Sequence, residues 1–135
     1  MTMRASGTLD VKLTPQPLAD SDADASLGRL SIDKRFHGDL EAASRGEMLS
    51  AGTAVQGSAG YVAIERVSGT LHGRHGAFVL QHNATMTRGA PALNIIVVPD
   101  SATGELEGLR GQMTINIADG QHLYEFEYTL AQDAH

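Results

Sequence analysis

Strict alternation of apolar and polar residues is the feature that most restricts how this chain can fold. In the segment TLDVKL, Leu9, Val11 and Leu13 fall at every second position, and the segment YEFEYTL at 124–130 repeats the pattern. Successive side chains of a β-strand point to opposite faces of a sheet, so this spacing predicts strands with one buried and one solvated face. No segment keeps a 3.6-residue period over three helical turns. The sequence therefore predicts an all-β fold.

Further apolar runs bring the expected number of strands to about eight. Fifteen glycines stand mostly between the runs, and Asp119-Gly120 is a strong signal for a two-residue hairpin. A meander of about eight strands can close on itself, which removes its exposed edges. We therefore expect residues 1–135 to form one domain, a closed eight-stranded antiparallel meander barrel. The expected strands are 8–13, 30–36, 40–50, 61–71, 77–87, 92–98, 112–118 and 124–130.

Two longer connections interrupt this regular spacing. Residues 18–28 are acidic, small and polar, and we expect a mobile loop there. Residues 50–60 are rich in Gly, Ala and Ser, which predicts a second flexible connection that could act as a lid.

Composition excludes several classes of function. The formal net charge is −6 and the 10 Lys and Arg residues are scattered, so we expect no nucleic-acid binding, which needs clustered positive charge. The absence of Cys removes disulfides and thiolate chemistry and fits a cytoplasmic protein. No apolar signal region and no run of about 18 apolar residues is present, so we expect neither secretion nor membrane association. No cofactor fingerprint occurs, and no cofactor is expected.

A glycine-rich pattern occurs twice, in GTLHGRHGAFVL at 69–80 and in GELEGLRGQMTI at 104–115. The preserved positions are glycines, which allow a positive φ or a close approach of the backbone, and apolar residues, which pack in the core. We therefore expect both segments to follow the same path, a turn with its Leu under the barrel end and then an inward-facing strand. The two histidines of the first copy, His72 and His75, have Glu and Arg as counterparts. Because Arg is no metal ligand, we interpret both as solvated turn residues and expect no metal site.

The repeat also assigns a direction to His82. Phe78 and Leu80 match apolar residues of the second copy and should face inward, so His82, two positions further on, should face inward as well; its counterpart is Ile117. An inward polar residue of a small barrel is either a satisfied core group or a ligand contact. His82 is therefore either a hydrogen-bonded core histidine or a group that binds a ligand or exchanges protons with it.

Alternation yields four further candidates for a site inside the barrel. Tyr124 is either a packing residue or a ligand contact, and Lys34 either extends to a barrel mouth or binds an anion. Tyr61 and Glu65 share one face of their strand, which lies either inside or outside. If it lies inside, Glu65 can orient the imidazole of His82; if outside, Glu65 makes a surface or subunit contact. We expect His82 to lie within reach of a second polar side chain, with Glu65 and Tyr124 the best candidates.

Two stretches resemble known families. The segment TGELEGLRG at 103–111 resembles the T-G-x-L/F-x-G-x-x-G motif of barrels of the allene oxide cyclase and dirigent type. The longer stretch 46–111 resembles more closely a bacterial family of unknown function, whose members are similar over nearly the whole chain. The resemblance implies an allene-oxide-cyclase-like, eight-stranded antiparallel barrel, a fold that is commonly trimeric. It implies no activity, and the chain has no Cys for any role that a cyclase gives to Cys.

The segment ALNIIVVP is apolar on both faces. Leu93, Ile95 and Val97 alternate with Ile96 and Val98. A barrel strand has only one inner face, so a second subunit or a long loop must cover the other. We expect a homo-oligomer, either a trimer or a dimer.

These observations favour one function and leave one alternative. We expect a cytoplasmic barrel that holds a small, largely apolar molecule in its lumen, with isomerase or cyclase chemistry as an extension. The alternative is a filled barrel that acts as a structural or protein-interaction module. A pocket that touches His82 favours the first, and a packed lumen favours the second. The sequence leaves open whether the protein is an enzyme.

Overall fold

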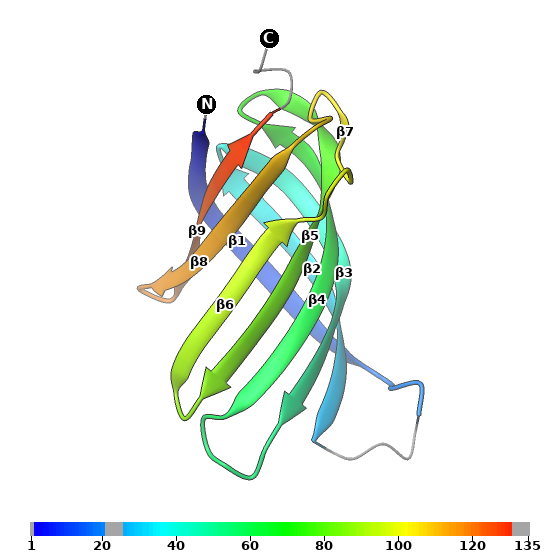
Figure 1. The fold of residues 1–135 in the computed structure, drawn as a ribbon, viewed down its shortest axis with the longest axis vertical. Helices are drawn as coiled ribbons and strands as arrows, with labels where there is room; N and C mark the ends of the chain where they lie inside the picture. The colour runs from blue at the N-terminus through cyan, green and yellow to red at the C-terminus, as the bar shows by residue number, and fades with distance from the viewer. Residues whose placement is uncertain (1, 21–25, 131–135) are drawn as a thin grey trace.

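The computed structural model describes residues 2–20 and 26–130, and nine β-strands account for most of that part of the chain (Figure 1). No helix among the described residues has the length and hydropathy needed to span a membrane. The strands are β1 (Met3–Gln16), β2 (Leu27–Gly38), β3 (Leu40–Gly52), β4 (Ala59–Leu71), β5 (Arg74–Thr87), β6 (Ala90–Val97), β7 (Thr103–Gly104), β8 (Arg110–Ala118) and β9 (Gln121–Thr129).

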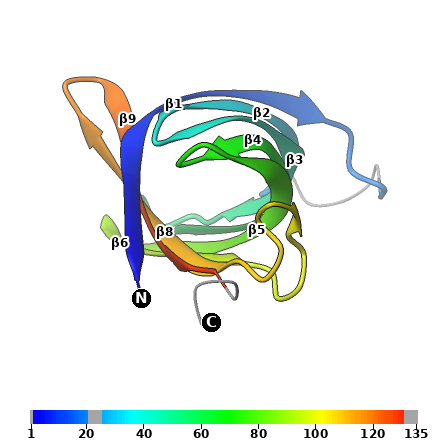
Figure 2. The ribbon, with the colours of Figure 1, turned by 90° about the horizontal axis from the view of Figure 1, so that it is seen from above.

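Eight of these strands close into an antiparallel barrel, which confirms the predicted closed eight-stranded all-β fold. Each consecutive pair from β1 to β6 is hydrogen-bonded, β6 pairs with β8, β8 pairs with β9, and β9 returns to β1. The ninth strand, β7, has two residues and pairs with the start of β5. Seen from above, the long strands form a closed ring (Figure 2).

The pairing between β6 and β8 is shorter than the other pairings of the barrel. Only two residue pairs join these strands, Ile95 with Met113 and Ile96 with Gln112. Away from these pairs the two strands diverge toward the end that carries the connection between β5 and β6 (Figure 1). Backbone hydrogen bonds therefore close this side of the barrel in one half only.

Large apolar side chains fill one half of the barrel. Phe36, Phe78 and Phe126 are at most 1% exposed, and the rings of Phe78 and Phe126 stack with their centroids 5.7 Å apart. Leu106 and Leu109, from the connection before β8, are buried in the same core. This half of the barrel is a packed core, and such burial is the main stabilising contribution in a small domain.

The repeated pattern keeps its side-chain directions but not its secondary structure. Leu71 and Leu106 are both buried, and Gly73 and Gly108 both adopt positive φ, at 79° and 87°. However, β4 continues to Leu71, whereas the chain leaves β7 at Gly104, with φ 68°, and forms turns before β8. The prediction of a common backbone path is therefore wrong for the part of each copy before Gly73 and Gly108. The first copy pairs with β3 as far as Leu71, whereas the strand pairing of the second copy with β5 ends at Gly104.

The first of the two longer connections is shorter than the sequence predicts. β1 continues to Gln16 and β2 begins at Leu27. Residues 21–25 of the expected mobile loop lie outside the described residues.

The second connection, 53–58, is hydrogen-bonded to the turn between β5 and β6. The backbone N–H of Gly89 donates to the carbonyl of Gly57 at 2.9 Å, and that of Arg88 donates to Ser58 Oγ at 3.0 Å. Two connections at this end of the barrel are thus joined, and the flexibility expected of residues 50–60 stays a prediction.

On the outer face of β6, Ile96 is half-buried, as is Val98 just after the strand. The chain folds back on β5 there, because Val98 N–H donates to the carbonyl of Val79 at 2.9 Å and Val79 N–H donates to Ser101 Oγ at 3.1 Å. A connecting segment thus supplies part of the cover that the sequence required. The predicted homo-oligomer stays a prediction.

Candidate functional site

The other half of the barrel holds a pocket of about 690 Å³. All eight long strands contribute inward-facing residues to its wall, as their alternation dictates. The pocket opens beside the connections between β3 and β4 and between β5 and β6, whose flanking residues form part of its lining. Most of the wall is apolar and includes Leu9, Ile32, Met48, Ala84, Leu93 and Ile115.

Four polar side chains meet at the inner end of this pocket, next to the packed core. Glu65 is at the centre and has no exposed surface. Its Oε2 accepts a hydrogen bond from Lys34 Nζ at 2.8 Å and lies 2.5 Å from His82 Nε2, and its Oε1 accepts one from Ser44 Oγ at 2.6 Å. Lys34, Ser44 and His82 are each at most 5% exposed. We call these four residues the lumen cluster.

Adjacent strands bring the lumen cluster together. Lys34 comes from β2, Ser44 from β3, Glu65 from β4 and His82 from β5. A close approach of β3 to β4 at Gly46, which pairs with Glu65, is part of this arrangement. A Cβ atom at Gly46 would lie 2.0 Å from the carbonyl oxygen of Ile64 and 2.6 Å from Glu65 Cα, so only glycine fits.

The partners of Glu65 determine its charge. Burial alone raises the pKa of this carboxyl, but the hydrogen bond to His82, the charge and hydrogen bond of Lys34 and the hydroxyl of Ser44 together lower the pKa to about 2. Glu65 is therefore ionised at neutral pH. A buried carboxylate without partners is very costly, so the four side chains stabilise one another as a unit.

Two groups of the lumen cluster keep hydrogen-bonding capacity. Both Lys34 and His82 line the pocket. His82 Nδ1 has no hydrogen-bond partner among the described residues, and Lys34 Nζ uses one of its three donors on Glu65. No fully buried side-chain nitrogen or oxygen of the described residues lacks a partner, so Nδ1 is not sealed inside the protein. It is therefore open to a molecule in the pocket.

Tyr61 lies beside the lumen cluster. It is half-buried, lines the pocket, and has its ring centroid 6.3 Å from that of His82. Burial and then the negative charge of Glu65 raise the pKa of its hydroxyl, which therefore stays protonated at neutral pH. Of the two directions that the sequence left open for Tyr61 and Glu65, the structure has the inward one.

The expected contact of Tyr124 with His82 is not formed. Tyr124 is buried in the packed half, where its hydroxyl accepts a hydrogen bond from Leu40 N–H at 2.9 Å. The same hydroxyl lies 3.0 Å from the carbonyl oxygen of His37, to which it can donate. Tyr124 thus joins β9 to the turn between β2 and β3. It is not part of the pocket wall.

His72 is more than a solvated turn residue. It sits at the exposed turn between β4 and β5 with φ 48°, as a turn residue should, but its Nδ1 is hydrogen-bonded to the hydroxyl of Tyr128. The sequence could not indicate this pair, which is 56 residues apart. His75 is exposed. Within the described residues no group of three or more His, Cys, Asp or Glu side chains is placed to hold a metal ion.

Sequence reasoning missed the roles of Ser44 and Gly46. The alternation of Leu40 and Ala42, both buried, places Ser44 on the inner face of β3. That signal was available, but it does not say which group Ser44 meets. Gly46 is required because β3 and β4 approach each other closely, and the sequence of a single strand does not indicate the distance to its neighbour.

A second, smaller hollow lies on the outer face of the barrel. It has a volume of about 370 Å³, and Leu49, Val62 and Ile64 are exposed in it. An ion pair between Arg29 and Glu47 forms part of its border. This outer groove is the natural competitor of the lumen for any apolar ligand.

Comparison with known proteins identifies a family of unknown function, as the long stretch 46–111 predicted. The family model described as "Protein of unknown function (DUF3224)" matches residues 5–128. A crystal structure of a protein with unknown function from this family, from Shewanella oneidensis MR-1, has a TM-score of 0.92 and 53% sequence identity and covers 96% of this chain and 98% of its own. No curated protein matches the chain. The chain belongs to the DUF3224 family.

Proposed function

We propose that this protein binds a small, largely apolar molecule in the hollow half of its barrel. The observation that carries the proposal is the pocket of about 690 Å³, apolar along its wall, that ends on His82 and Lys34. Small-molecule sites typically occupy roughly 300–1,000 Å³ and combine apolar walls with a few polar groups that orient the ligand. The hollow half favours binding over the alternative of a filled structural barrel.

Proton transfer is a second candidate function, and the contact between Glu65 and His82 favours it. A carboxylate that orients an imidazole, whose other nitrogen faces the substrate, is a common arrangement in general acid–base catalysis. Here Glu65 lies against Nε2, and Nδ1 remains open. Isomerase or cyclase chemistry would use His82 to move a proton on the bound molecule.

Binding of the uncharged fluorescent probe N-phenyl-1-naphthylamine tests the primary proposal. We expect the probe to bind with increased fluorescence, and Ala84→Phe to weaken its binding by roughly tenfold or more, because the added ring fills the pocket. Asn83→Phe places the same ring on the outer face, one residue away, and is the matched control.

The control should bind the probe as the wild type does. A wild-type protein that does not bind the probe would contradict the proposal. Weakening by Asn83→Phe without weakening by Ala84→Phe would place the probe in the outer groove and would contradict it as well. Circular dichroism of each variant verifies that the barrel is intact.

A further inference from the structure

We infer that the ligand of the lumen carries an anionic oxygen group, such as a carboxylate, and binds with that group against Lys34 and His82. This inference rests on the proposed binding function and specifies the chemical class of the ligand. Its starting point is the charge of the pocket wall. Among the described residues, the ionisable side chains that line the pocket are Lys34, Tyr61, His82 and His122, and no Asp or Glu is among them.

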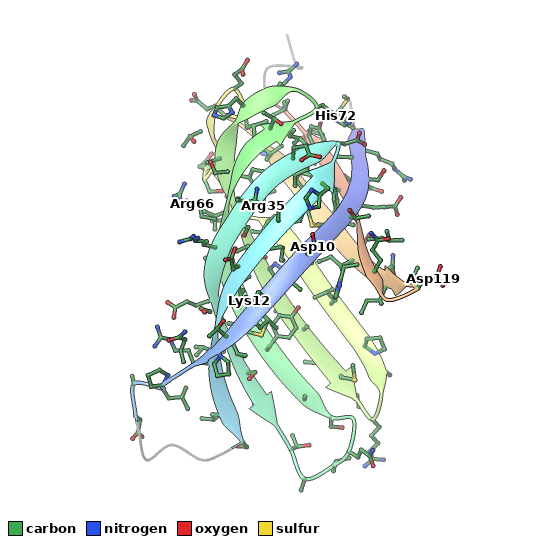
Figure 3. All side chains as sticks on the ribbon, turned by 180° about the vertical axis from the view of Figure 1, so that it is seen from behind. Asp10, Lys12, Arg35, Arg66, His72 and Asp119 are labelled. Carbon is green, nitrogen blue, oxygen red and sulfur yellow. The ribbon has the colours of Figure 1, made fainter. Side chains whose placement is uncertain are left out.

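This distribution is opposite to that of the whole chain. The chain has 16 Asp and Glu residues against 10 Lys and Arg residues. Its outer surface carries charges of both signs, including Asp10, Lys12, Arg35 and Arg66, which lie on the outside of the barrel wall (Figure 3). Although the protein is acidic, no carboxylate of the described residues lines the lumen pocket.

Glu65 does not change this conclusion, although it lies just behind the wall. Its side chain has no exposed surface, and both of its oxygens already contact partners in the lumen cluster. Because Glu65 has no exposed surface, a cationic ligand in the pocket does not reach it. It would instead meet the ammonium group of Lys34, which repels it.

The groups that do face the pocket are suited to an anion. Lys34 offers its remaining N–H donors, and Tyr61 offers a hydroxyl that burial and then the neighbouring negative charge of Glu65 keep protonated. With a neutral His82, the side chains of Lys34, Glu65 and His82 carry no net charge, and with a protonated His82 they carry one positive charge. In either state an oxygen anion can accept hydrogen bonds from Lys34 and Tyr61, whereas His82 Nδ1 donates only when the ring is protonated, because the N–H of a neutral ring is used at Nε2 on Glu65. Charge-assisted bonds of this kind are the strong ones.

Three naphthalene ligands of the same shape test the inference. They are 2-naphthoate, 2-naphthalenemethanol and 2-naphthylmethylammonium, titrated against the wild-type protein at pH 7 by calorimetry. We expect naphthoate to bind at least about tenfold more tightly than the alcohol, and the ammonium compound to bind least tightly.

Two variants locate the effect. Lys34→Met should reduce the affinity for naphthoate by roughly tenfold while changing the affinity for the alcohol little, because the apolar wall is retained. Lys34→Arg keeps the positive charge and should retain most of the preference for naphthoate over the alcohol. Lys12→Met, on the outer face of β1 (Figure 3), is the matched control and should bind all three ligands as the wild type does.

The outcomes separate this inference from the proposed function. If the alcohol binds as tightly as naphthoate, the inference is overturned while binding in the lumen stands. The same holds if Lys34→Met weakens both ligands equally. If neither the naphthalene ligands nor N-phenyl-1-naphthylamine binds, the proposed function fails and the inference fails with it. Should Lys34→Met not fold, the ranking of the three ligands on the wild-type protein decides alone.

Discussion

Glu65 shows how one buried charge can organise a site inside a barrel. A carboxylate in a protein interior needs hydrogen bonds and opposite charge to offset its lost hydration. Lys34, Ser44 and His82 supply these, and they come from three other strands. As a result, two nitrogen-bearing side chains are fixed at the inner end of an apolar pocket. The orientation of His82 is thus a consequence of stabilising Glu65.

Replacing Glu65 by Gln should change the acid sensitivity of the protein. The pKa of Glu65 in the folded protein is about 2, below its ordinary value of 4.5. The ionised carboxylate therefore stabilises the fold above pH 4.5, and this contribution is lost as the pH falls from 4.5 toward 2. The loss amounts to on the order of 3 kcal/mol.

Urea denaturation across this pH window measures the effect. We expect the free energy of unfolding of Glu65→Gln to fall less steeply with acid than that of the wild type, even though the variant is less stable at neutral pH. Glu125→Gln, on the exposed face of β9, should keep the wild-type slope. Identical slopes for Glu65→Gln and wild type would contradict the lowered pKa.

At the scale of the strand, β3 and β4 show what alternation can and cannot predict. Period two predicted that Glu65 and Tyr61 share a face, and that Glu65 could orient His82 if this face is inside. It could not select the face, because Val62 and Ile64 make the other face equally apolar. The structure leaves these two residues half exposed on the outside, at 53% and 50%. The choice is made by the partners that Glu65 finds inside, and these belong to other strands.

The close contact of β3 with β4 gives a prediction for Gly46. Gly46→Ala should destabilise the protein by about 1–3 kcal/mol or more, because the added methyl group meets the backbone of β4, which cannot move as a side chain can. It should also weaken binding in the lumen, since Glu65 is directly opposite. Urea denaturation and probe titration measure the two effects.

Gly60→Ala is the matched control within the same pair of strands. Its added Cβ would lie 3.4 Å from the nearest atom, the carbonyl oxygen of Ala84, which is an ordinary contact. We expect this variant to unfold within about 1 kcal/mol of the wild type. Equal stability of Gly46→Ala and Gly60→Ala would show that the close approach is not needed.

The whole molecule is a barrel with one packed half and one hollow half. The sequence predicted the closed eight-stranded barrel, because strand number and turn positions are local signals. It also predicted an inward His82, although the common backbone path assumed for that argument was only partly correct. It could not predict the division into halves. That division depends on which inward-facing side chains lie at the same height along the barrel axis. These heights follow from the register between the strands.

The same limit explains the fate of Tyr124. It was correctly expected on the inner face of the last strand, but on a level with the packed core rather than with His82. Its partners are the backbone groups of His37 and Leu40, 87 and 84 residues away in the chain. A sequence pattern within one strand carries no information on such a distant level.

A crystal structure with 6-bromo-2-naphthoate tests the central claim most directly, since the anomalous signal of bromine locates the ring independently of the carboxylate. We predict a bromine peak toward the mouth of the lumen pocket, near Leu93, with the carboxylate within hydrogen-bonding distance of Lys34 Nζ or His82 Nδ1. A ligand seated only in the outer groove at Leu49, Val62 and Ile64, or one whose bromine end lies against Lys34, would contradict the account.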